Sequence, residues 1–165
     1  MSEENNPAKL PPPPPQPPSL CSREEQQQWF AALNAWSAEV TRHAVGIAKR
    51  HFAAGGLEMR KELESSTDWS GFALYLSLAL GPVIDQTPQT EWVRSLMSEL
   101  VDFSLLNPSG SPDARLAELL AQFIQWDPQR RGAFKALLPA KADPALQLIY
   151  EWEADEQRRK DEAYW

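Results

Sequence analysis

Apolar residues recur at helical spacing along most of this chain, and the first such stripe follows residue 22. Its members lie three or four residues apart, the period of one helix face: Trp29, Leu33, Trp36, Val40, Ala44, Ile47 and His51. Ser22 and Glu25 fit a capping box at its start. Gly55 and Gly56 end it. The pattern predicts a helix over residues 22–54, about 50 Å long, as either the spine of a domain or the seam of a dimer.

The next apolar segment, residues 72–80, is ambiguous between helix and strand. Every second residue is large and apolar, as in a strand, yet alanine and leucine favour helices. A lone strand would also find no second strand in the chain to pair with. We therefore expect a buried helix here, closed by Gly81 and Pro82. Residues 57–64 are strong helix formers in a short stretch.

Four pairs of a capping side chain and a proline punctuate the second half of the chain. They are Thr87 with Pro88, Ser111 with Pro112, Asp127 with Pro128, and Asp143 with Pro144. A proline in the first turn of a helix loses nothing, because its missing N–H would have no partner there. Each pair therefore predicts a helix start, and an apolar stripe follows each one. Together these elements predict an all-α domain over residues 22–165, an irregular helical bundle of about six helices.

Residues 1–21 are rich in proline, which lacks a backbone donor and restricts the residue before it. We expect a disordered proline-rich N-terminal tail with polyproline II character. Lys9, Pro12 and Pro15 match the spacing [KR]-x-x-P-x-x-P of ligands of SH3, WW or profilin-type domains, which makes Pro12 and Pro15 candidate partner-binding residues. The alternative is a spacer. A free tail predicts that deleting residues 1–20 leaves the melting temperature unchanged.

Composition and charge narrow the function. The net charge of −7 disfavours general binding to polyanions, because phosphate binding needs a surplus of lysine and arginine. Cys21 is the only cysteine, so no intramolecular disulfide forms. The N-terminal residues do not resemble a secretory signal, and no apolar stretch reaches the length of about 20 residues that spans a bilayer. We expect a soluble, acidic, cytoplasmic protein.

Candidate chemistry is sparse. The only two histidines, His43 and His51, lie eight residues apart in no metal-binding motif, and Cys21 sits at the edge of the tail with nothing to activate it. No glycine-rich phosphate loop occurs. The sequence thus predicts no catalytic residue, no metal, no cofactor and no small-molecule substrate.

Two clusters are candidates for recognition. Arg42, Lys49 and Arg50 belong to a basic stretch of the first helix, which either contacts an acidic partner or nucleic acid or is a solvated face balanced by nearby glutamates. Tyr164 and Trp165 end the chain after a charged run. Exposed aromatic residues anchor interfaces, so this pair either binds a partner or packs in a groove of its own domain.

These observations predict a non-enzymatic protein-protein interaction module, such as an adaptor, regulator or assembly factor, that uses a helical domain and a polyproline tail. The expected partner is another protein or a second copy of the chain, bound through the first helix as a homo-oligomer. The alternative is a nucleic-acid-associated regulator that uses the basic stretch.

Overall fold

The helices predicted from the apolar stripes are present in the computed structural model, which describes residues 9–86 and 90–163. These residues form an all-α bundle without a strand. Its helices are α1 (Arg23–Ala54), α2 (Lys61–Glu64), α3 (Trp69–Gln86), α4 (Glu91–Leu106), α5 (Ala114–Ile124), α6 (Pro128–Lys135) and α7 (Asp143–Ala163), with a 3-10 turn, η2 (Ala140–Ala142), before α7. None of the described helices is both long and apolar enough to cross a membrane.

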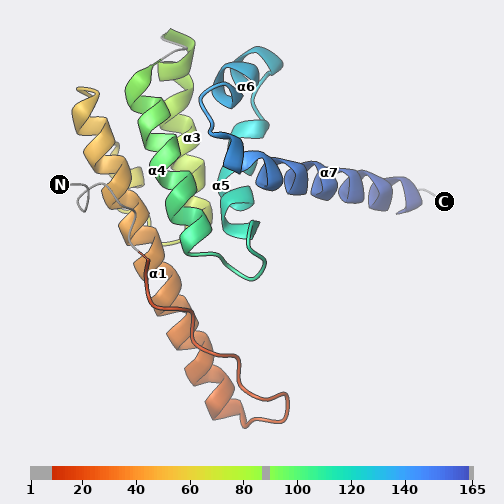
Figure 1. The fold of residues 1–165 in the computed structure, drawn as a ribbon. Coiled ribbons are helices and arrows are strands. Elements are labelled where there is room, and N and C mark those ends of the chain that lie inside the picture. The colour runs from red at the N-terminus through yellow and green to blue at the C-terminus, as the bar shows by residue number, and fades with distance from the viewer. Residues whose placement is uncertain (1–8, 87–89, 164–165) are drawn as a thin grey trace.

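Helix α5 lies at the centre of the bundle, in contact with α3, α4, α6 and α7 (Figure 1). Seven of its eleven residues are buried, which few amphipathic surface helices achieve. At its end Phe123 stacks on Phe134 of α6 with ring centroids 4.3 Å apart. Trp126 meets both rings edge-on, which closes this end of the core.

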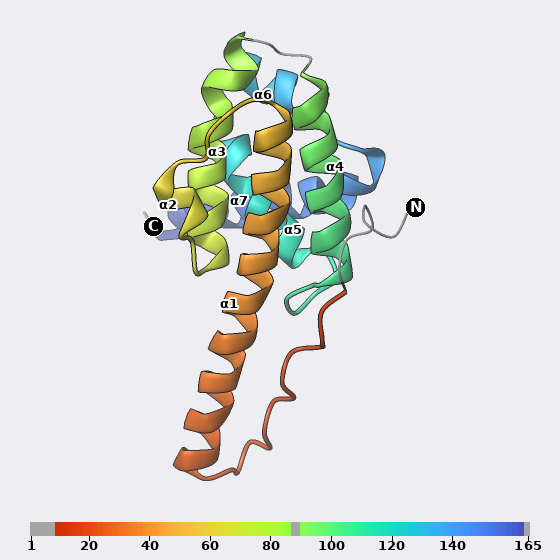
Figure 2. The same ribbon diagram turned by 90° about the vertical axis from the view of Figure 1, so that its left-hand side faces the viewer.

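Helix α1 divides into two halves of different environment. Its buried residues begin at Val40 and end at Phe52, where it packs against α3 and α4. Residues 23–39 contain no buried residue and extend beyond the bundle, with residues 9–20 running back alongside them (Figure 2). We call residues 9–39 the arm. Only the second half of α1 is therefore a spine of the domain.

The capping residues predicted for α1 and α6 are confirmed. The hydroxyl oxygen of Ser22 accepts a hydrogen bond from the Glu25 amide at 3.2 Å, which starts α1 as expected. The Asp127 carboxylate accepts from the amides of Gln129 and Arg130, both at 3.1 Å, and starts α6. Helix α7 begins at Asp143 with its proline in the first turn, but Asp143 has helical backbone angles directly after η2 and is not the cap that was expected.

Two of the predicted boundaries fall elsewhere. The start expected at Ser111 and Pro112 is wrong, because α5 begins at Ala114. Gly110 adopts a φ of 72° in the preceding turn, and Ser111 pairs there with Ser109 in an isolated bridge. The start expected at residues 87–88 lies outside the described residues, and α4 begins at Glu91.

The helix end expected at residues 81–82 is also wrong, because α3 runs on past Pro82. Pro82 is exposed, so its ring lies at the surface of the helix. The carbonyl that lacks a donor, because proline has no N–H, is on the same solvent-facing side. The next turn is fixed by tertiary contacts. Ile84 is buried, and Arg130 of α6 donates from Nε to the Asp85 carboxylate at 2.8 Å.

Helix α7 leaves the core after its first two turns. Ala145 and Ile149 are its buried residues, and residues 150–163 are all exposed. Figure 1 shows this part of α7 projecting away from the bundle, in a different direction from the arm. The molecule therefore has two extensions, one from each end of the described chain.

The junction of α1 and α4 yields a stability prediction. A methyl group at Gly55 would lie 2.6 Å from the ring of Trp92, which packs edge-on against Phe52. Gly55→Ala should lower the free energy of unfolding by about 1–3 kcal/mol through this overlap. Gly46→Ala, at an exposed and open position of the same helix, should raise it by about 0.5–1 kcal/mol. Urea denaturation measures both, and effects of equal sign would contradict the prediction.

Candidate functional site

The arm contains two tryptophan side chains that hold the proline segment against α1. The indole N–H of Trp36 donates to the Pro11 carbonyl at 2.8 Å, and that of Trp29 donates to the Pro14 carbonyl at 3.2 Å. The later proline residue meets the earlier tryptophan, so the segment runs antiparallel to the helix. This position differs from the free tail expected for residues 1–21, for which disorder stays a prediction.

The proline segment presents its candidate ligand residues to solvent. Pro14 and Pro17 are half-buried on the α1 side, whereas Lys9, Pro12 and Pro15 are all exposed. Residues three apart share a face in a polyproline II helix, which has three residues per turn. The residues with the [KR]-x-x-P-x-x-P spacing are thus exposed, while the carbonyls of Pro11 and Pro14 bond to the helix.

The base of the arm is tied to the loop after α4. The amide of Leu10 donates to the side-chain oxygen of Asn107 at 2.8 Å. The side-chain nitrogen of Asn107 donates to the Phe103 carbonyl at 2.9 Å, which fixes its orientation. Arg115 Nε donates to the backbone carbonyl of Asn107 at 2.5 Å. One asparagine therefore connects the proline segment to the core.

Arg115 is a buried cation in contact with two aromatic rings. Its guanidinium lies 5.2 Å from the ring centroid of Trp36 and 4.9 Å from that of Trp69. The Trp69 indole in turn donates to the Arg115 carbonyl at 2.9 Å. Burial lowers the pKa of Arg115 from its ordinary value, and the charge of Glu118 opposes this shift. Cation–π contacts of this kind are strongest where water is excluded.

Sequence reasoning missed this cluster, although one signal was available. Arg115 lies four residues before Leu119 and eight before Phe123, on the apolar face of its helix. A charged residue on such a face needs a buried partner. The sequence did not indicate which rings would supply it.

The basic residues of α1 do not form a free positive surface. Arg42 is paired with Glu39, Lys49 with Glu64 at 2.8 Å, and Arg50 with Glu99 at 2.5 Å. The hydrogen bonds from Arg42 and Lys49 lower the pKa values of the Glu39 and Glu64 carboxyls from their ordinary values. These pairs resemble the balanced, solvated face that was one of the two interpretations.

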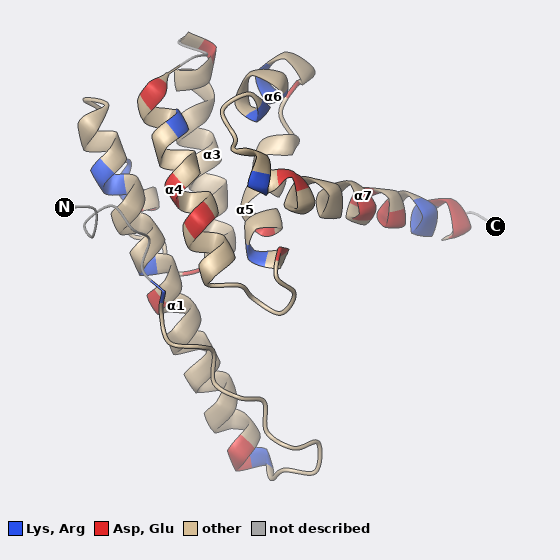
Figure 3. Cartoon of the chain, in the orientation of Figure 1, with Lys and Arg blue, Asp and Glu red and all other residues tan. Residues whose placement is uncertain are grey.

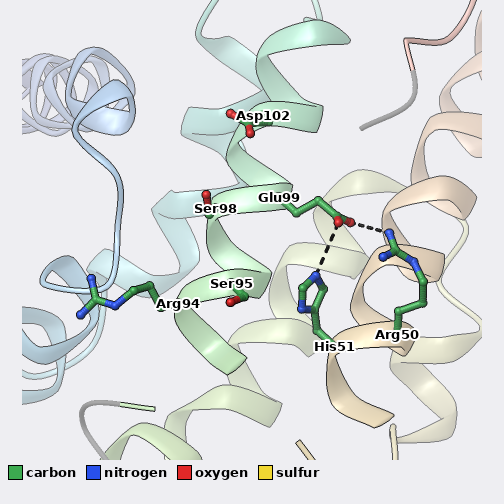
Figure 4. A pocket seen from close by; sticks show the side chains of 7 residues that line it. All are labelled: Arg50, His51, Arg94, Ser95, Ser98, Glu99 and Asp102. Carbon is green, nitrogen blue, oxygen red and sulfur yellow. Dashed lines mark hydrogen bonds and ion pairs between the residues drawn. The ribbon is translucent and has the colours of Figure 1, made fainter. Parts of the chain in front are cut away.

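A polar hollow lies between α1 and α4 (Figure 4), lined by Arg50, His51, Arg94, Ser95, Ser98, Glu99 and Asp102. Glu99 is its centre, with Arg50 on one carboxylate oxygen and His51 Nε2 at 3.6 Å from the other. Among the described residues neither serine hydrogen-bonds to His51. The hollow lacks the contact between nucleophile and base that acyl transfer uses.

Two further expectations concern the C-terminal aromatic pair and the cysteine. Tyr164 and Trp165 lie outside the described residues, so their role in binding stays a prediction. Cys21 is half-buried at the tip of the arm, and its amide donates to the Pro18 carbonyl at 3.0 Å in the turn before α1.

Within residues 9–86 and 90–163 no group of three or more histidine, cysteine, aspartate or glutamate side chains is placed to hold a metal.

The surface of the arm differs from that of α7. No charged side chain occurs from residue 26 to residue 38, and Figure 3 shows the middle of the arm without blue or red. Leu20 is 97% exposed at the tip and Phe30 is 48% exposed on the helix. By contrast, Figure 3 shows charged residues along the projecting part of α7.

The contacts of Arg115 with Trp36 and Trp69 yield a second stability prediction. Arg115→Lys should lower the free energy of unfolding by about 2–4 kcal/mol, because lysine keeps the charge but loses the planar guanidinium over the two rings and the Nε donor. Arg42→Lys, in an exposed ion pair, is the matched control and should leave it unchanged within error. Urea denaturation measures both, and similar values for the two variants would refute a special role for Arg115.

Known proteins give no further guidance. No protein-family model, no curated protein and no solved structure matches the chain. A function has to be inferred from the surfaces described above: the arm, the hollow beside α4 and the ion-paired face of α1.

Proposed function

We propose that the protein is a non-enzymatic protein-protein interaction module, an adaptor, regulator or assembly factor, that binds its partners through the arm. A cytoplasmic location, expected from the sequence, is part of this proposal. The observation that supports it most is the arm itself. A helix half with no buried residue extends beyond the core and presents apolar side chains without charges between them.

The energetics of the arm favour binding. Exposed apolar side chains such as Leu20 and Phe30 gain about 25 cal/mol for each Å² that a partner covers. Aromatic residues dominate the energy of many interfaces, because they bury a large area with few rotatable bonds. An uncharged surface also loses no ion hydration when it is covered. A folded chain that had no partner would be more soluble with charged residues at these positions.

The proline segment supplies a second contact of known chemistry. Lys9, Pro12 and Pro15 face outward, and segments with this spacing bind aromatic-lined grooves such as those of SH3 and WW domains. The hydrogen bonds from Trp29 and Trp36 reduce the freedom that the segment would lose on binding. This supports the ligand interpretation over the spacer.

A second copy of the chain is the other partner that the proposal includes. Each copy presents the same exposed apolar side chains, Leu20 and Phe30, so two arms can bury them against each other. The nucleic-acid alternative lacks comparable support, because Arg42, Lys49 and Arg50 each have a carboxylate partner.

Affinity capture with quantitative mass spectrometry tests the proposal. The full chain should enrich a defined set of proteins, and the double variant Leu20→Ser with Phe30→Gln should reduce that set about tenfold or more, as expected for lost apolar anchors. Light scattering on the same variants measures self-association.

The matched control is Leu74→Ser with Leu78→Ser on α3, where the leucines are 42% and 48% exposed but lie outside the arm. This control should retain the captured proteins. Equal losses in both double variants, or no enriched protein together with a monomeric chain, would reject the arm as the interaction surface.

A further inference from the structure

We infer that the face of α1 formed by Trp29 and Trp36 is a polyproline-binding site, and that its ligand is the chain's own segment of residues 10–17 in polyproline II conformation. We call the two tryptophans the indole pair. This inference concerns the inner face of the segment, whereas the proposed function concerns its outer face and the exposed apolar side chains of the arm.

The hydrogen-bonding chemistry of the two sides is complementary. An indole offers one N–H donor and no acceptor. A proline run offers carbonyl acceptors and no N–H, and polyproline II makes no internal hydrogen bonds that would occupy them. The indole pair uses both of its donors on this segment, at Pro11 and Pro14.

The spacing of the indole pair matches the ligand. Trp29 and Trp36 lie seven residues apart, which is about 10.5 Å along an α-helix. The two accepting carbonyls lie three residues apart, which is one turn and about 9.3 Å in polyproline II. Donors and acceptors that recur at nearly the same distance along parallel axes can form both bonds at once. A single tryptophan would bind one carbonyl and would not select for the three-residue spacing of polyproline II.

Other backbone conformations of the ligand do not fit this spacing. In a β-strand, residues three apart point to opposite faces, so the two carbonyls could not both reach one helix. In an α-helix three residues rise only about 4.5 Å, less than half the distance between the donors. The ligand class is therefore polyproline II rather than extended peptide in general.

The surrounding contacts set the length of the site. At one end Leu10 is bound to Asn107 of the helical core. At the other end the chain turns at residues 18–21, with Pro18 accepting from the Cys21 amide at 3.0 Å. Pro17, one polyproline turn beyond Pro14, is half-buried on the same side. The bound segment thus extends from residue 10 to residue 17.

Binding at this site is coupled to helix formation in the arm. Residues 23–39 contain no residue buried in the core, and a helix of this length is marginal in water unless a face is packed. In the described part of the chain, Trp36 contacts Arg115 of α5, and the proline segment packs along the residues before it. The ligand should therefore stabilise the first half of α1, and its removal should let this half fray.

The experiment keeps the full chain and disables its ligand. One variant replaces the proline run by a flexible chain of equal length, through Pro11→Gly, Pro12→Gly, Pro13→Gly, Pro14→Gly and Pro15→Gly. A synthetic peptide with the sequence of residues 9–19 is the probe. The chain has seven tryptophans, whose indole N–H signals are monitored by ¹⁵N–¹H NMR while the peptide is added.

The peptide should bind the glycine variant and move the signals of Trp29 and Trp36. It should not bind the wild-type chain at concentrations well below about 1 mM, because the covalently attached segment has an effective concentration of that order. Trp29→Phe in the glycine variant should weaken binding about fivefold through the loss of one hydrogen bond. Trp152→Phe, on the projecting part of α7, is the matched control and should leave the affinity unchanged.

Hydrogen exchange provides the second readout. Amides of residues 25–38 should exchange about tenfold or more faster in the glycine variant than in the wild-type chain, in the manner of local unfolding. Residues 40–52, which are packed in the core, should keep their protection in both and so report that the domain is folded.

Three outcomes would overturn the inference. The peptide leaves the Trp29 and Trp36 signals of the glycine variant unmoved, or residues 25–38 keep their full protection without the proline run. In the third, the wild-type chain forms dimers that Trp29→Phe dissolves, which would assign the ligand to a second copy rather than to the chain's own segment.

Discussion

The buried guanidinium of Arg115 is the constraint to which the rest of the structure is fitted. A cation away from water needs compensation, and here it comes from two ring faces and a backbone carbonyl rather than from a close carboxylate. Those groups belong to α1, to α3 and to the loop after α4, while Arg115 itself is on α5. Each of these segments must therefore lie at its own fixed distance from the guanidinium. The packing of the four is therefore specified more narrowly than apolar contact alone would require.

Trp36 extends this constraint from the core into the arm. Its ring faces Arg115, and its N–H donates to Pro11. Asn107 has the same double role, because its backbone carbonyl accepts from Arg115 and its side chain accepts from Leu10. The register of the proline segment along α1 thus depends on the helical domain. A shift of one residue would break both contacts and would turn Lys9, Pro12 and Pro15 away from solvent.

Local signals in the sequence predicted the helices and several of their ends, and tertiary contacts account for the errors. Ser22 and Asp127 cap helices with their own side chains, so a few neighbouring residues contain the whole signal. The end of α3 depends instead on an ion pair between Asp85 and Arg130, which are far apart in the chain. The position of Arg115 among aromatic rings depends on tryptophans of two other helices.

The candidate sites follow the same division between local and tertiary signals. Proline content predicts an extended segment, and the motif residues Pro12 and Pro15 are exposed in it, as are Pro11, Pro13 and Pro18. Composition does not reveal that the segment lies against α1, because that contact depends on the distance between Trp29 and Trp36. The basic residues of α1 were visible in the sequence. Their partners were less so, because Glu64 and Glu99 come from other helices.

The two extensions of the molecule differ in how they interact with dissolved ions. The middle of the arm has no charge, so contacts made there contain no ion pair for dissolved ions to screen. The projecting part of α7 presents closely spaced acidic and basic side chains, among them the pairs Asp155 with Arg158 and Glu156 with Lys160. Contacts made through α7 weaken as the screening length contracts, to about 8 Å at physiological ionic strength. Charge screening thus affects one of the two extensions and not the other.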